Sequence, residues 1–520
     1  MKKYIIILFC FAVSGIILSS CSDFLEENPQ TSLSTEQVFA DKNNIQAYLD
    51  GVYYKWRDTR INRKAFFTLL GTDEIQQGEY QVKTDPTQAG LDKYDGFYEA
   101  NSTVVAEAWN VRWPAVVLSS EALASLNKMI SQASKEDSLE LKSYIGQASF
   151  YRASVLFELV RYWGEIPIAE IEGTKINLTG RKPMDVVYKV IEDDLKIAGE
   201  YLLDRANTKN VRIPTAWAAK AMLAKVYMSA QEESGFRNFG KAKTLLEDIQ
   251  LRGGFTLVNN YADLWTGEGD VSSEVIYSFS FNNVWPDANE LQWYAGSRAV
   301  SSDPNCYMGG YDLALPTEYC YKEAGQGGIW ESGDVRKEES IRYDFRYNNK
   351  SPQAVSGFGE DQLLPHIKKF EDKRIDGIKS FYETGKDLYL IRYSDVLLML
   401  AECMNEEGAT PDAVRLVNEK VRARAWGGTL PDAHKWDTNM SQTTFRKEIL
   451  NERMRELCFE GWRRMDLLRT GNFVDYIKEH NRWAKESATI TTNHQRFPIP
   501  LVEIKQNENI SEADQNPGFN

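Results

Sequence analysis

The sequence predicts a mainly α-helical protein in which a helical scaffold holds an irregular, loop-rich part with few short strands. Three observations support this. Apolar residues recur at helical spacing through most of residues 101–252 and 389–472. Helical periodicity is lost over residues 61–100 and 253–388, where Gly, Asn and Asp turn signals are frequent. Only residues 274–281, EVIYSFSF, have the β-branched and aromatic composition of a strand.

Residues 1–20 are expected to be an export signal that is removed. Two lysines follow Met1, and the apolar run from Tyr4 to Leu18 is shorter than the ~20 residues of a membrane span. The run ends in LSSC, which resembles a bacterial lipobox and predicts Cys21 as the lipidated first residue. Residues 21–34 would then be a tether. The alternative is an ordinary signal peptide followed by an incidental cysteine.

The helical scaffold is expected to cover residues 35–60, 101–252 and 389–472. Its first helix spans Glu36–Trp56 behind a Ser34/Thr35 cap, and residues 61–100 form a long surface loop system. Helical character returns at 101–130, where Pro114 marks a kink or boundary. Residues 141–168 predict a helix that is apolar on most faces and therefore buried between others. Further helical segments are expected at 184–203, 214–231, 237–250, 389–408, 411–425 and 443–471.

Residues 214–231 and 237–250 form a predicted helix pair. Small side chains, Ala216, Ala219, Ala221 and Ala224, allow the two helices to approach closely. Repeated pairs of this kind resemble tetratricopeptide units, which have a period of ~34 residues. The full repeat consensus is absent.

The net charge of -14 excludes some partners. Loss of Lys2 and Lys3 leaves 59 basic and 75 acidic residues, a charge of -16, which disfavours nucleic acid and anionic lipid as partners. The four histidines are scattered without ligand spacing, so neither a zinc site nor another cofactor is expected. Acidic loop residues Asp85, Asp92 and Asp95 could ligate calcium, but their spacing matches no known calcium loop.

The cysteines are too few for a disulfide framework in so long an exported chain. Cys306 and Cys320 flank a loop and could form a disulfide bond, a possibility that the spacing leaves open.

A charge-dense block spans residues 452–466 and permits two interpretations. Paired carboxylates such as Glu452 and Glu456 are what a glycosidase needs. Arginines at similar offsets, however, are typical of a helix laced by local ion pairs, which is the preferred interpretation.

Several separate stretches together resemble the SusD/RagB family of surface lipoproteins from Bacteroidota, over nearly the whole mature chain. The stretches include CSDFLEENPQTSLSTEQVFADKNNIQAYLDGVYYKW, GQASFYRASVLFELVRYWGEIPI, AAKAMLAKVYM, LIRYSDVLLMLAECMNE, NERMRELCFEGWRRMDLLRTG and FPIPLVEIKQNENISEADQNPGFN. The resemblance implies tetratricopeptide-like helix pairs, a variable ligand-binding part, no catalysis, and a SusC-like TonB-dependent outer-membrane transporter as partner. The acidic residues after Cys21 (Asp23, Glu26 and Glu27) resemble the family's surface-export signal.

The function expected from this resemblance is capture of glycans at the outer face of the outer membrane and their delivery to the transporter. Three alternatives remain. The chain could bind peptides, as the RagB branch of the family does. It could be a surface glycoside hydrolase, or a structural lid without a ligand site of its own.

A glycan site needs aromatic platforms for the sugar's C–H face and planar polar groups for its hydroxyls. Loop residues of both kinds occur in residues 61–100 and 253–388, and Trp285, Trp293 and Tyr307 are the best candidates. Rings in loops also fill gaps beneath irregular backbone or face the transporter, so each residue has a structural alternative. The predicted ligand residues are Asp73, Gln77, Tyr80, Tyr98, Trp285, Asn289, Trp293, Tyr294, Arg298, Tyr307 and Trp330.

Overall fold

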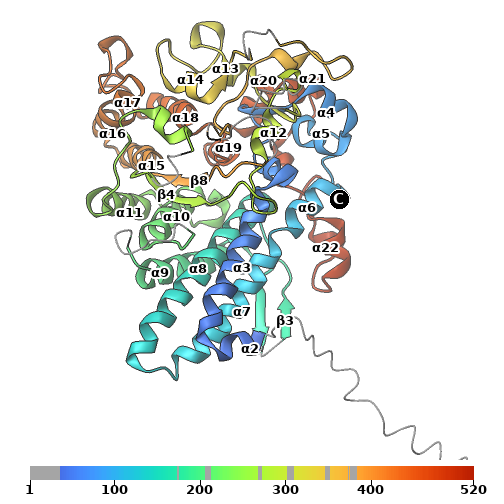
Figure 1. Cartoon of the computed structure of the whole chain (residues 1–520), viewed down its shortest axis with the longest axis vertical. Coiled ribbons are helices and arrows are strands. Elements are labelled where there is room, and N and C mark those ends of the chain that lie inside the picture. Colours follow the sequence, from blue (N-terminus) through green and yellow to red (C-terminus); the bar gives the residue numbers. More distant parts are fainter. Residues whose placement is uncertain are drawn as a thin grey trace, which may run out of the picture. The chain divides into compact units, whose positions relative to one another are not determined.

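Helices dominate the fold (Figure 1). The computed structural model describes residues 35–172, 175–204, 212–267, 272–300, 310–345, 352–372, 374 and 383–519. The chain divides into two compact units, residues 1–48 and 49–520. Cys21 and the export signal lie outside the described residues, as do Cys306 and Tyr307.

The helix predicted at Glu36–Trp56 is two helices, α2 (Thr35–Ala40) and α3 (Ile45–Arg57). The Asp41 side chain explains the break. Its carboxylate accepts the backbone N–H of Asn43 at 3.0 Å and caps a 3₁₀ turn at Lys42–Asn44, so the chain restarts its helix at Ile45.

Most of the predicted scaffold helices are confirmed in the larger unit. α7 begins at Trp113 with Pro114 in its first turn, which confirms that proline as a helix boundary. The scaffold helices are α6 (Thr103–Asn110), α7 (Trp113–Ile130), α8 (Lys135–Trp163), α9 (Met184–Tyr201), α10 (Ala216–Ser229), α11 (Phe239–Arg252), α15 (Tyr393–Glu406), α16 (Thr410–Val417), α17 (Ala423–Ala425), α18 (Gln442–Leu457) and α19 (Arg463–Arg469).

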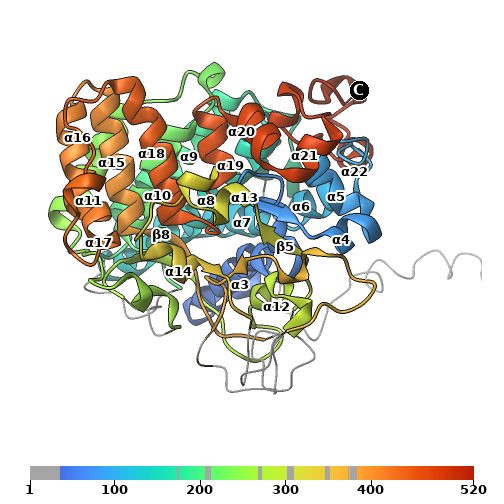
Figure 2. The ribbon, with the colours of Figure 1, turned by 90° about the horizontal axis from the view of Figure 1, so that it is seen from above.

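Each scaffold helix packs against the next. α7 packs on α8, α8 on α9, α9 on α10, α10 on α11, α11 on α15, and α15 on both α16 and α18. Figure 2 shows α16, α15 and α18 side by side. Ala219, Ala221 and Ala224 of α10 are fully buried, as expected for small residues where helices approach closely.

The strands form four two-stranded antiparallel sheets in the described part of the chain. β4 (Val275–Phe279) confirms the predicted strand and pairs with β8 (Leu388–Arg392). The helix predicted at 389–408 is therefore wrong at its start, because β8 gives its backbone groups to this ladder and α15 begins only at Tyr393. The other pairs are β1 (Ile75–Gln77) with β5 (Ala314–Pro316), β2 (Ala169–Glu172) with β3 (Lys175–Leu178), and β6 (Ile341–Arg342) with β7 (His366–Ile367).

Residues 61–100 are not the surface loop system that the sequence suggested. They contain a 3₁₀ helix (Asn62–Thr68), β1, and the helices α4 (Glu79–Thr84) and α5 (Pro86–Lys93), and residues 65–78 are all buried. Polar partners make this possible. Asp73 pairs with Arg463 at 2.6 Å, and Glu74 accepts the backbone N–H of Phe459 at 2.8 Å.

The helical block predicted at 443–471 is interrupted between α18 and α19. Phe459 and Gly461 adopt left-handed φ angles of 67° and 83°, which an α-helix does not accommodate. The remaining short helices are α12 (Leu291–Ala295), α13 (Glu318–Tyr321), α14 (Arg336–Ser340), α20 (Phe473–His480), α21 (Arg482–Ser487) and α22 (Leu501–Gln506). No helix in the described ranges is long and apolar enough to span a membrane.

Candidate ligand-binding surface

Six half-buried side chains from four separate segments meet near α12, and we call them the aromatic surface. Trp293 is central. Its ring lies 4.8 Å from the ring of Tyr294 and 4.8 Å from that of Tyr311, measured between centroids. The aromatic surface consists of Tyr80, Trp293, Tyr294, Arg298, Tyr311 and Phe358.

The guanidinium of Arg298 lies between Tyr311 on one side and Tyr80 and Phe358 on the other. It lies 4.8 Å from the ring centroid of Tyr311, 4.2 Å from that of Phe358 and 5.4 Å from that of Tyr80. Tyr80 and Phe358 are themselves 4.7 Å apart. Flat rings thus alternate with a planar cation, an arrangement that offers both apolar faces and hydrogen-bond donors.

The segment around Asp312 fixes the position of these rings. Asp312 adopts a left-handed φ of 49°, and its carboxylate accepts the backbone N–H of Arg298 at 2.9 Å. The same carboxylate oxygen lies 3.1 Å from Nε2 of His366. Gly78 allows the chain to approach closely here, because a Cβ at that position would lie 2.1 Å from the carbonyl oxygen of Asp312.

Two side chains from residues 61–100 form hydrogen bonds with Tyr311. Arg63 donates to the Tyr311 hydroxyl at 3.0 Å, and the Gln81 amide donates to its carbonyl oxygen at 2.9 Å. Burial raises the pKa of Tyr294 further above its ordinary value of 10.0, so its hydroxyl stays protonated and can donate a hydrogen bond. Burial also raises the pKa of Glu290, at the start of α12, with a further contribution from Glu383.

The structure brings together four of the predicted ligand residues: Tyr80, Trp293, Tyr294 and Arg298. Trp285 is 54% exposed, but no ring contact or ion pair in the described residues joins it to the aromatic surface. Phe358 was missed by the sequence analysis. Its position in the glycine-rich segment SGFGE is the same signal that selected the other loop rings.

Five predicted ligand residues lie in the interior instead: Asp73, Gln77, Tyr98, Asn289 and Trp330. Most have partners within the protein. The indole N–H of Trp330 donates to the Cys320 carbonyl at 2.5 Å, and the Asn289 amide donates to the Lys386 carbonyl at 2.9 Å. The Tyr98 hydroxyl accepts from Arg464 at 3.1 Å. These buried side chains expose almost no area to a ligand, so they are not part of the aromatic surface.

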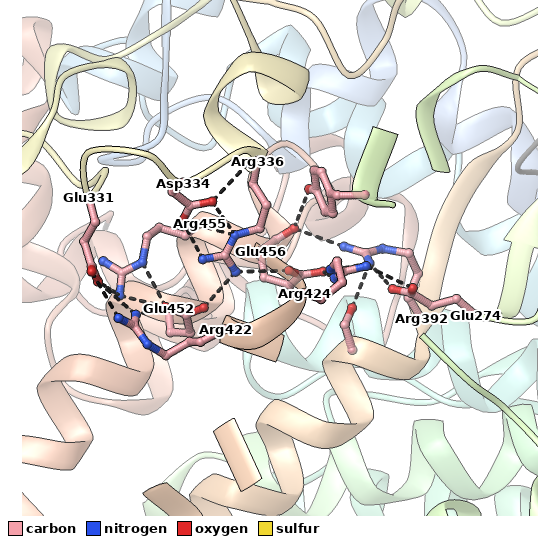
Figure 3. A network of polar contacts seen from close by, with 12 residues as sticks. Glu274, Glu331, Asp334, Arg336, Arg392, Arg422, Arg424, Glu452, Arg455 and Glu456 are labelled. Carbon is pink, nitrogen blue, oxygen red and sulfur yellow. Dashed lines mark hydrogen bonds and ion pairs between the residues drawn. The ribbon is translucent and has the colours of Figure 1, made fainter. Parts of the chain in front are cut away.

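The charge-dense block at 452–466 forms a buried ion network (Figure 3). Its partners come mainly from distant segments, not from the local helix turns that the sequence suggested. Glu452 accepts from Arg336 at 2.7 Å and from Arg422 at 2.9 Å, and Arg455 supplies the local contact, three residues away, at 2.8 Å. Glu456 accepts from Arg336 at 3.1 Å and from Arg424 at 2.6 Å.

This network lacks the properties of a hydrolase site. Burial alone would raise the pKa of Glu452, but Arg336, Arg455 and Arg422 together hold it well below its ordinary value. The same balance, with Arg424 and Arg392 as the main cations, lowers the pKa of Glu456. Both carboxylates therefore stay ionised, fully buried and paired, whereas a glycosidase requires an accessible acid of raised pKa.

The calcium candidates have other partners. Asp85 pairs with Arg63 at 2.8 Å and caps α5, and Asp92 accepts the backbone N–H groups of Gly71 and Gln77. No group of three or more His, Cys, Asp or Glu side chains among the described residues is arranged to hold a metal ion.

Comparisons with known proteins agree on one family. Residues 317–519 match the profile described as "SusD family", and residues 23–228 match one described as "Starch-binding associating with outer membrane". The SusD-like protein P25 of Formosa agariphila is 23% identical, over 99% of both chains. Trp293, Tyr294, Arg298 and Tyr311 lie in the segment between the two matched regions.

Solved structures show the same fold. A SusD homolog from Bacteroides thetaiotaomicron has a TM-score of 0.76 at 20% identity and covers 94% of this chain and 99% of its own. A laminarin-binding SusD-like protein has a TM-score of 0.73 at 21% identity, over 92% of this chain and 100% of its own.

Proposed function

Because the chain belongs to the SusD family, whose members are binding proteins and not enzymes, we propose that it binds glycans at the bacterial cell surface. The observation that supports this best is the aromatic surface around Trp293. Its rings can lie against the C–H faces of sugars, while Arg298 and the tyrosine hydroxyls can bond to sugar hydroxyls. The similar laminarin-binding protein and the starch-binding profile favour a neutral glucan as the first ligand to test.

The captured oligosaccharide would then be passed to an outer-membrane transporter. Cys21 would tether the protein to the outer membrane, and a SusC-like TonB-dependent transporter would receive the captured oligosaccharide. The protein would act as a lid that opens and closes over the transporter. Two measurements test this part: a Cys21→Ala variant should move to the soluble fraction, and the wild-type protein should copurify with a TonB-dependent transporter from outer membranes.

Isothermal titration with laminari- and malto-oligosaccharides tests the ligand site. Trp293→Ala should weaken binding about tenfold, because one stacked ring contributes about 1.4 kcal/mol. Trp217→Ala is a matched control, since Trp217 is also half-buried and stacked with a cation, at 4.4 Å from Lys220, but lies on α10. Trp285→Ala tests whether the exposed indole belongs to the same site.

The outcomes separate the alternatives. Binding of peptides but not of glycans by the purified protein would favour the RagB-like role. No binding of either class would leave a structural lid, and release of shortened oligosaccharides would mean that the protein is a hydrolase. Equal loss of glycan binding in Trp293→Ala and Trp217→Ala would show that the aromatic surface is not the site.

A further inference from the structure

A cavity of about 770 Å³ lies among the scaffold helices and shares no residue with the aromatic surface. Its walls come from α15, α18 and α19, from residues 229–239 between α10 and α11, and from residues 470–476. The C-terminal end of α8 and residues 495–496 complete the lining. Several of these helices lie close together in Figure 2. The volume is within the range that small-molecule sites have in proteins.

The lining of this cavity is positive, although the protein is acidic overall. Its four carboxylates each pair with an arginine of the same cavity: Glu232 with Arg237, Glu233 with Arg496, Glu402 with Arg469, and Glu406 with Arg446. Two further cations, Arg161 and Lys447, line the cavity and have no carboxylate partner among the described residues. The cavity thus has two positive charges that no carboxylate in the described part of the chain neutralises.

Arg161 is the more unusual of the two because it is only 5% exposed. Its Nε donates to the Phe157 carbonyl of its own helix at 3.2 Å, and its guanidinium lies 5.1 Å from the ring centroid of Trp462 and 4.4 Å from that of Phe157. Its Nη1 is buried and has no hydrogen-bond partner within the described residues. A buried guanidinium with no carboxylate partner and an unbonded N–H group is unfavourable, and its fork of N–H groups matches the two oxygens of an oxyanion.

We propose that this cavity is a second glycan site, which binds the oxyanion of an acidic saccharide against Arg161 and Lys447. The oxyanion is either a uronic acid carboxylate or a sulfate ester. The remaining lining favours a sugar over a bare ion. Asn472, Gln495 and Thr470 offer partners for hydroxyl groups, while Leu450 and Met465 provide apolar wall for C–H groups. The inference rests on the proposed glycan-binding function and extends it to charged substrates.

Titration calorimetry at low ionic strength tests the cavity with three probes: trigalacturonate, a sulfated galacto-oligosaccharide and neutral galactotriose. The wild-type protein should bind one acidic probe at least tenfold more tightly than the neutral one, and the preferred probe identifies the oxyanion. Arg161→Met should abolish this preference and keep or raise the melting temperature without ligand, because it removes an unpaired buried charge. Lys447→Met, at an exposed position where folding is not at risk, should reduce the preference about threefold.

Lys505→Met is the matched control, since Lys505 is an exposed lysine of α22 outside the cavity, and it should bind like the wild type. A wild-type protein with no preference for either acidic probe would overturn the proposal, as would a preference that survives in both Arg161→Met and Lys447→Met. Failure of the proposed glycan-binding function would give a result distinct from failure of the cavity proposal. In that case neutral glucans also fail to bind, or bind without any dependence on Trp293.

Discussion

Replacing Arg336 by Met should destabilise the protein strongly without changing its ligand. Arg336 is fully buried and donates to three carboxylates: Asp334 at 2.6 Å, Glu452 at 2.7 Å and Glu456 at 3.1 Å. Methionine has a similar length and no charge, so the variant leaves Asp334 and part of the Glu452 and Glu456 charge uncompensated. Loss of one partner in a buried ion pair costs about 3–5 kcal/mol.

That cost converts to a measurable shift. Unfolding entropy of about 2 cal/mol/K per residue gives about 1 kcal/mol/K for a chain of this length, so the melting temperature should fall by about 3–5 °C. Differential scanning calorimetry measures the shift. Arg415→Met is the control, since Arg415 pairs with Asp412 on the surface, where such a pair contributes at most about 1 kcal/mol. A melting temperature of Arg336→Met within 1 °C of the wild type would refute the reasoning, and so would loss of glycan binding by the folded variant.

Three further predictions follow from single sites. Burial raises the pKa of Glu74 to about 8, against an ordinary value of 4.5, so its contribution to stability is present below pH 4.5 and is lost as the pH rises toward 8. Glu74→Gln should therefore gain in melting temperature relative to the wild type between pH 5 and pH 8, and a constant difference across that range would contradict the assignment. Gly78→Ala should displace the segment around Asp312 and weaken glycan binding, because the new Cβ would lie 2.1 Å from the Asp312 carbonyl oxygen. Gly51→Ala should bind normally, because a Cβ at that position would have no neighbour within 4 Å. Burial raises the pKa of the thiols of Cys320, Cys403 and Cys458, the last to about 11, so peptide mapping after alkylation should find all three unmodified until the protein unfolds. If Cys320 stays unmodified even after unfolding without reductant, it is bonded to another cysteine.

The sequence predicted the scaffold well because its helices have strong local signals. Periodicity located α9, α10 and α11 to within a few residues, whereas α8 begins at Lys135 and ends at Trp163, five or six residues earlier than predicted at each end. Signals failed where partners are distant in sequence. Nothing local indicates that β8 pairs with β4, or that Asp73 finds Arg463 across 390 residues, and so residues 61–100 were assigned to the surface.

The candidate site was predicted by residue type but not by location. Rings in Gly-rich segments selected Trp293 and Tyr80, which belong to the aromatic surface, yet the same rule selected Trp330 and Tyr98, which are buried. Composition cannot separate these cases, because a loop aromatic is exposed or buried according to which distant segment covers it. Tyr98 is an example, because its hydroxyl lies 3.1 Å from Arg464, 366 residues along the chain, and its ring stacks on Phe497.

The buried ion network and the aromatic surface are built from different residues. Arg336, Arg392 and Arg424 connect Glu274, Asp334 and residues 452–460 in one buried network. Ion pairs therefore hold the irregular part of the chain to the helical scaffold, where no continuous sheet does so in the described residues. The aromatic surface contributes nothing to that network. Trp293 and Tyr294 lie on the short helix α12, and Tyr80 lies on α4. Tyr311 is held by Arg63 and Gln81, which have no ion pair with the network in the described residues. Substitution of the rings should therefore change the ligand with little effect on folding, whereas substitution in the network should change folding with little effect on the ligand, a separation that Trp293→Ala and Arg336→Met test as a pair.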